Sequence, residues 1–166
     1  ALLGWLPGGM AIVVVMVCAF FTTFTGASGV TILALGGILY VILTQSGGYR
    51  ENFTTGLLTA SGSIGLLFPP SLPVILYGVV AQISIKQMYA GGIIPGVFMI
   101  VALSIMGITA AVRGKIPRVP FKGREALKAV KSSIWEILLP IVIIAGFFSG
   151  LMTLVEIGAF TVLYSL

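Results

Sequence analysis

The chain has 166 residues, of which 58% are hydrophobic and only 8% are charged. Its mean hydropathy is +1.19. A soluble domain of this length needs more surface charge to stay dissolved, so the composition excludes the soluble classes and predicts an integral membrane protein. Four runs carry no charge at all, at 1–49, 52–85, 87–112 and 137–155. Their lengths suit helices that cross an apolar core of about 30 Å, and they do not have the short alternating pattern of membrane strands, so we expect an all-α fold.

The first arm of the chain consists of two apolar stretches, Gly9–Thr23 and Val30–Gln45, joined by small and polar residues. Each stretch would be roughly 22–24 Å long as a helix, which is less than the core thickness. We therefore expect residues 1–49 to form a re-entrant helical hairpin with its tip at 24–31. An external loop between two full spans is the alternative, and it places both ends on the same side.

The segment ASGSIGLLFPPSLP, residues 60–73, places three prolines and two glycines inside an apolar run. It predicts a broken helix over 53–81, with a first half at 53–60, an unwound Ser61-Gly62-Ser63, and a second half that has Pro73 in its first turn. A further span is expected at 88–112. Irregular backbone at membrane depth is tolerated only where protein buries it or water reaches it. Tip and break together suggest a midplane site for an ion and a substrate, and ordinary proline and glycine kinks are the alternative.

Seven of the nine basic residues lie between positions 113 and 131, opposed only by Glu125. Short basic loops stay in the cytoplasm, so residues 113–133 are predicted to be a cytoplasmic connector. The same orientation puts the loop around Arg50 inside and Lys86 outside. A nucleic-acid partner is not expected, because membrane spans flank the basic run.

The titratable residue types indicate which coupling ion the chain suits and whether it could be an enzyme. The chain has no His and no Asp, and its four Glu residues fall near predicted membrane boundaries. A proton-coupled site needs a buried titrating group, whereas Na⁺ needs only neutral oxygen ligands, so Na⁺ is the expected ion and no other cofactor is expected. Neither a metal centre nor a catalytic triad can be assembled from these residue types, which disfavours an intramembrane enzyme.

Three motifs in a fixed order carry a family likeness: GASGVT, GGYRENFTTGLLTASGSIGLLFPPSLPVILYG and YAGGIIPG. With the later LMTLVEIGAF, this order resembles the large membrane subunit (DctM-like permease) of tripartite ATP-independent periplasmic (TRAP) transporters, in the ion transporter superfamily. One departure is LVEIG at 154–158, where family members often read PTEAA. The resemblance implies that 1–112 is the first inverted repeat of an elevator-type transporter, with 50–112 in its transport domain. Residues 134–166 would begin the second repeat, so we expect a piece of a longer chain.

The resemblance also implies a function and partners. The protein would import small organic anions, such as C4-dicarboxylates or sialic acid, with Na⁺ across the bacterial inner membrane. It would work with a small membrane subunit and a periplasmic substrate-binding protein. A non-transporting structural subunit of a membrane complex is the alternative.

The implied site joins the tip to the break. Carried over from the family, the Na⁺ ligands would be Gly26, Ser28, Gly29, Ser61, Gly62 and Ser63. Ser28 and Ser63 would also lie near the carboxylate of the substrate.

Overall fold

The computed structural model describes residues 6–114, 116 and 154–165, together with positions 138, 141–142, 145–146 and 149. Most of the predicted connector at 113–133, and most of 134–153 at the predicted start of the second repeat, lies outside the described residues. The chain divides into two compact units, Ala1–Phe121 and Lys122–Leu166. Every regular element in the described ranges is helical, which confirms the all-α prediction. The second unit, taken by itself, contains α8 (Leu154–Ser165).

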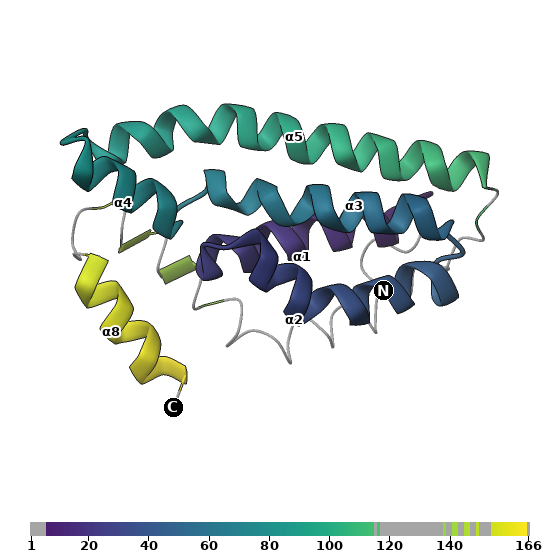
Figure 1. Cartoon of the computed structure of the whole chain (residues 1–166), viewed down its shortest axis with the longest axis horizontal. Helices are drawn as coiled ribbons and strands as arrows, with labels where there is room; N and C mark the ends of the chain where they lie inside the picture. The colour runs from purple at the N-terminus through teal and green to yellow at the C-terminus, as the bar shows by residue number, and fades with distance from the viewer. Residues whose placement is uncertain are drawn as a thin grey trace. The chain divides into compact units, whose positions relative to one another are not determined.

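The first unit opens with a helical hairpin of α1 (Gly9–Thr25) and α2 (Ser28–Val41), which continues into a π-helical turn, η1 (Ile42–Ser46) (Figure 1). The predicted tip at 24–31 was too wide, because Thr25 still belongs to α1 and Ser28 already belongs to α2. Only Gly26 and Ala27 lie between the two helices. The second arm is longer than expected: Ser28–Ser46 has 19 residues and is apolar enough to cross a membrane. The first arm, α1, has 17 residues and stays below the length of a candidate span, so only one arm is short and re-entrance stays a prediction.

The broken helix comprises α3 (Glu51–Ile64), a 3₁₀ turn η2 (Gly65–Leu67) and α4 (Leu72–Val80), and its two parts are bent by 43°. The prediction that Ser61-Gly62-Ser63 unwinds was wrong, because these residues complete the last turn of α3. The break lies further along, at 65–71. Its cause is the proline pair at 69–70, which lacks two N–H donors and holds the preceding Phe68 in an extended conformation (φ −101°, ψ 147°). Pro73 does lie in the first turn of α4, as predicted.

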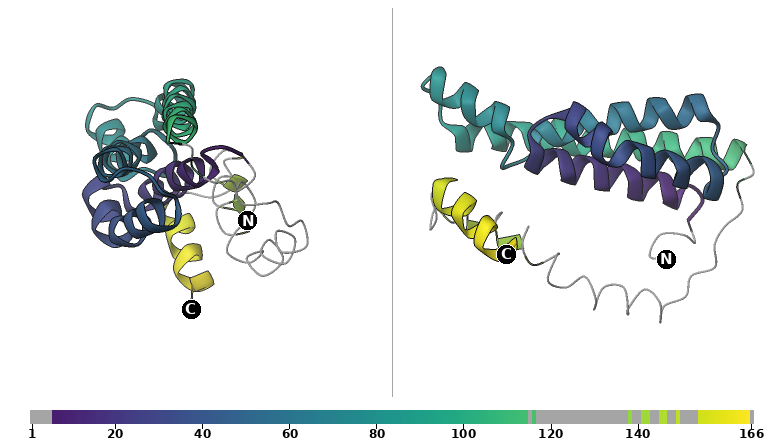
Figure 2. Two further views of the ribbon diagram at one scale, coloured as in Figure 1. Left: turned by 90° about the vertical axis from the view of Figure 1, so that its right-hand side faces the viewer. Right: turned by 60° about the horizontal axis from the view of Figure 1, so that its bottom comes forward.

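Helix α5 (Ile85–Arg113) is 29 residues long and runs alongside α3, as both views of Figure 2 show. Helix α1 packs against α2, α3 and α5. The core between them is built from small and branched side chains, including Val14, Val15, Cys18, Leu57 and Leu103. The outer faces leave large apolar side chains exposed, with Leu33 at 87% and Val80 at 83%. A helical unit with an apolar outer surface is what a lipid environment requires.

The described helices include two that could each cross a membrane by length and composition, or three if the bent pair counts as one span.

In the full-length protein we expect Gln87→Cys, at the start of α5, to react with an impermeant maleimide added outside the cell. Ser46→Cys, at the end of η1, should react only after the membrane is opened. Both positions are exposed, and the native Cys18 is buried. Labelling of both from the same side would contradict the orientation drawn from the basic residues.

Candidate functional site: the hairpin tip against the helix break

One side chain, Thr23, links the last turn of α1 to the break in the α3–α4 helix. The Thr23 hydroxyl lies 2.8 Å from the Ala19 carbonyl oxygen and 3.1 Å from the Gly65 carbonyl oxygen, with the geometry to donate to either. A methyl group on Gly65 would overlap the Ala19 carbonyl oxygen and would lie 2.6 Å from Thr22 Cβ. Only glycine allows this approach, so the backbone of the break lies directly on the hairpin.

The tip itself is closed by Gly26, whose φ of 66° is in the left-handed region. Its N–H donates to the Thr22 carbonyl oxygen at 2.8 Å and so ends α1. A Cβ at this position would lie 2.8 Å from Leu72 Cβ and 3.2 Å from Leu72 N. The tip therefore rests on the first residue of α4, as Figure 1 shows for the turn between α1 and α2 beside the α3–α4 junction.

Hydroxyl groups link the two arms just behind the tip. Thr22 Oγ1 and Thr31 Oγ1 are 2.6 Å apart in a fully buried hydrogen bond. The Thr25 hydroxyl lies 3.3 Å from Thr31 Oγ1 and 3.3 Å from the Ala27 carbonyl oxygen. These bonds hold α1 and α2 in one register, so the turn has a fixed shape.

The structure brings some of the predicted ligands together and not others. Gly62 is buried against α2, where an added Cβ would lie 3.6 Å from the Ser28 carbonyl oxygen. Ser28 is half-buried at the start of α2, whereas Gly29 and Ser63 are exposed. Ser61 is buried, and its hydroxyl donates to the Leu57 carbonyl oxygen at 2.6 Å within α3. Gly26, as described, closes the tip.

Four helix ends meet in this region. The carboxyl ends of α1 and of the α3–η2 segment carry carbonyl groups without helical partners, which favour a cation. The amino ends of α2 and α4 carry free N–H groups, which favour an anion. The contacts from Gly26 to Leu72 and from Gly62 to Ser28 bring these ends of opposite polarity together.

A serine that the sequence analysis did not single out lies at the same junction. Ser71 precedes α4 and is fully buried, and its hydroxyl has no hydrogen-bond partner among the described residues. Its carbonyl oxygen accepts a hydrogen bond of 2.7 Å from the Tyr89 hydroxyl. The pattern of a serine followed by Leu72 and Pro73 is a helix-start signal that could have pointed to it.

The donor set decides which ions could fit. Among the described residues, no three or more His, Cys, Asp or Glu side chains cluster. The oxygens at the tip and the break belong to carbonyl and hydroxyl groups and are uncharged. Such donors suit a hard monovalent cation far better than a transition metal.

Comparison with known proteins places the whole chain in one group. Residues 1–166 match the family model described as the tripartite ATP-independent periplasmic transporter, DctM component. The chain is 35% identical to the C4-dicarboxylate TRAP transporter large permease protein DctM of Vibrio cholerae, over 99% of this chain and 36% of that protein. It is 37% identical to the sialic acid TRAP transporter permease protein SiaT of Haemophilus influenzae, over 100% of this chain and 27% of that protein.

A third relative is the 2,3-diketo-L-gulonate TRAP transporter large permease protein YiaN of Escherichia coli, 34% identical over 99% of this chain and 39% of that protein. The chain therefore spans about a third of the length of the curated relatives it matches. These relatives are permeases, which are transport proteins rather than enzymes.

The Gly65 contact generates a stability prediction. In the full-length protein, Gly65→Ala should lower the melting temperature, because the new methyl group pushes the break off α1 at a cost of about 1–3 kcal/mol. Gly56→Ala is the matched control in α3, since nothing lies within 4 Å of a Cβ there. It should leave stability unchanged or raise it by about 0.5–1 kcal/mol. Equal melting temperatures for the two variants would show that the close approach does not exist.

Proposed function

Because the chain belongs to the family of the DctM component of tripartite ATP-independent periplasmic transporters, we propose that the full-length protein is a large permease subunit that imports small organic anions. The names of the three relatives above give a C4-dicarboxylate, sialic acid and 2,3-diketo-L-gulonate as their substrates. All of these are organic acids, so a carboxylate is the common chemical feature of the proposed substrate. The apolar helices of the first unit place the protein in a membrane, which we take to be the bacterial inner membrane, crossed several times.

The observation that carries the proposed mechanism is the meeting of four helix ends at the tip and the break. Backbone carbonyls and hydroxyls there would hold Na⁺, with Gly26, Ser28 and Gly29 contributing from the tip. Ser61, Gly62 and Ser63 would contribute from the end of α3. The approach of Gly62 to the Ser28 carbonyl oxygen supports this pairing. Ser61 would contribute its oxygen lone pairs, because its hydrogen is donated to Leu57.

Binding of the anion follows from the same geometry. The amino ends of α2 and α4 offer N–H groups and a positive dipole end to a carboxylate. Ser28, at the start of α2, and the exposed Ser63 would add hydroxyl donors. A Na⁺ ion held beside them would neutralise part of the substrate's charge, so that ion and anion stabilise each other's binding.

The transport step would use the first unit as a moving block. The hairpin and the broken helix would shift together across the membrane in an elevator mechanism, with a second, inverted repeat completing the site. A small membrane subunit would form part of the fixed scaffold, and a periplasmic binding protein would deliver the substrate. The tight contacts of Gly26 and Gly65 support movement of hairpin and break as one body.

A non-transporting structural subunit is the second candidate, and one observation favours it. The hydroxyls of Thr22, Thr25 and Thr31 already bond to each other at the tip, as they would in a helix kink that needs no ligand. The two candidates differ in what Na⁺ does to the protein, because only an ion site makes the folded state more stable as Na⁺ is added.

We expect Na⁺ to raise the melting temperature of the full-length protein and to drive uptake of an organic acid into liposomes that hold the complete complex. The double variant Ser28→Ala, Ser63→Ala should raise the Na⁺ concentration for half-maximal uptake about tenfold, equal to ~1.4 kcal/mol of lost binding. Thr55→Ala is the control, since this exposed α3 hydroxyl only donates to the Glu51 carbonyl oxygen. Gly62→Val should abolish uptake while membrane insertion persists.

Two results would overturn the proposal. Uptake that does not respond to Na⁺ would remove the ion from the mechanism. A protein that inserts and assembles but neither transports any organic acid nor gains stability from Na⁺ would favour the structural subunit.

A further inference from the structure

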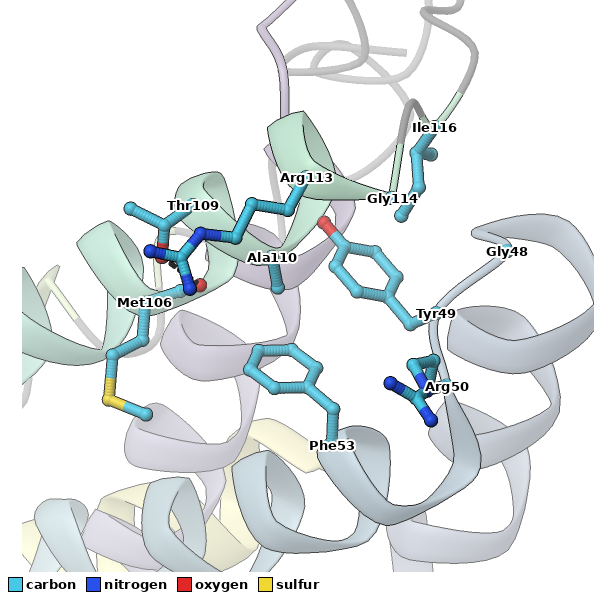
Figure 3. A pocket seen from close by; sticks show the side chains of 10 residues that line it. All are labelled: Gly48, Tyr49, Arg50, Phe53, Met106, Thr109, Ala110, Arg113, Gly114 and Ile116. Atoms are coloured by element: carbon cyan, nitrogen blue, oxygen red, sulfur yellow. Dashed lines mark hydrogen bonds between the residues drawn. The ribbon is translucent and has the colours of Figure 1, made fainter.

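A pocket of about 420 Å³ lies at the opposite end of α3 from the hairpin tip, between the start of α3 and the last turns of α5. Two arginines line it, Arg50 just before α3 and Arg113 at the end of α5 (Figure 3). In this view their guanidinium groups lie on either side of the Phe53 ring. The pocket belongs entirely to the first unit.

The charge in this pocket is not neutralised by the part of the chain that the structure describes. No acidic side chain there pairs with Arg50 or Arg113, and both residues are exposed. Two guanidinium groups that line one pocket repel each other. An anion bound between or beside them offsets this repulsion. Arginine presents several N–H donors in a planar fork, which matches the oxygens of a phosphate.

Two packed aromatic side chains, Tyr49 and Phe53, line the pocket together with the arginines. The rings of Tyr49 and Phe53 stack with their centroids 5.6 Å apart and an angle of 17°. Tyr49 is buried, and its hydroxyl donates to the Gly107 carbonyl oxygen at 3.4 Å. Burial raises the pKa of Tyr49, so the phenol stays protonated and adds no negative charge to the pocket. The two arginines therefore lie next to aromatic side chains that stacking and a hydrogen bond hold in place.

The pocket opens onto an apolar surface. Met106 lines it and is 52% exposed, and the neighbouring Ile105 is 54% exposed on the same helix. Helix α5 is the longest candidate span, and the pocket lies at the end that the basic residues predict to be cytoplasmic. A ligand with an anionic head and apolar tails matches this combination, whereas a soluble anion would use only the arginines.

We infer that this pocket binds the phosphate head of an anionic phospholipid from the cytoplasmic leaflet, such as phosphatidylglycerol or cardiolipin. Arg50 and Arg113 hold the phosphate oxygens, and the acyl chains lie along the exposed apolar face of α5 next to Met106. The site is separate from the hairpin tip and does not depend on the proposed transport activity.

The test measures lipid retention by native mass spectrometry of the full-length transporter exchanged into detergent with defined lipids. The wild-type protein should retain phosphatidylglycerol or cardiolipin over phosphatidylcholine. Replacing either arginine, Arg50→Gln or Arg113→Gln, should reduce retention about fivefold, and the double variant should reduce it further than either single variant. Lys86→Gln, at the start of α5, is the control for loss of a positive charge and should leave retention unchanged. Both arginines are exposed, so the variants should keep the wild-type melting temperature in phosphatidylcholine.

Three outcomes would overturn the inference. The double variant could retain the anionic lipids as well as the wild type does. Lys86→Gln could reduce retention equally, which would make the effect one of net charge. Finally, inorganic phosphate at millimolar concentration could displace the lipid from the wild type and raise its melting temperature as much as the lipid does, which would assign the pocket to a soluble phosphate.

Discussion

The contact between Gly65 and the last turn of α1 is the constraint on which the rest of the first unit depends. With no side chain at this position, the break in the α3–α4 helix lies on the Ala19 carbonyl, and the Thr23 hydroxyl lies within donating distance of the carbonyl oxygens of both Ala19 and Gly65. That contact fixes where the hairpin ends relative to the break. Gly26 can then reach Leu72, and Gly62 can reach Ser28. The candidate site is thus set by backbone approach rather than by charged side chains.

The pattern of glycines and prolines in the sequence was enough to predict a helical hairpin and a broken helix, and both are present in the first unit. That the two form one binding site stays a prediction. The pattern could not locate the ends of the helices. Ser61-Gly62-Ser63 looks like an interruption because serine and glycine are weak helix formers, but local propensity is overridden when Ser61 bonds to Leu57 and Gly62 packs on α2. The prolines at 69–70 have no N–H group to donate, so packing cannot restore the helical hydrogen bonds there. The chain therefore breaks four residues later than expected.

Contacts between distant residues were beyond sequence reasoning. Thr22 and Thr31 are nine positions apart and meet only because the turn between α1 and α2 shrinks to two residues. From the sequence, Arg50 indicates only on which side of the membrane its loop lies. Arg113 is one of the seven basic residues between positions 113 and 131. Only the folded unit shows that they share a pocket, since 63 positions separate them along the chain. Residue type indicated what each group could do, and the packing determined which groups act together.

The buried hydroxyl of Ser71 has a consequence for energetics. A polar group that leaves water without gaining a partner costs about 1–3 kcal/mol of folding stability. The Ser71 hydroxyl is in this position among the described residues, whereas the equally buried Ser61 hydroxyl donates to the Leu57 carbonyl oxygen. The entry into α4 is therefore a place where the fold gives up stability that the end of α3 keeps.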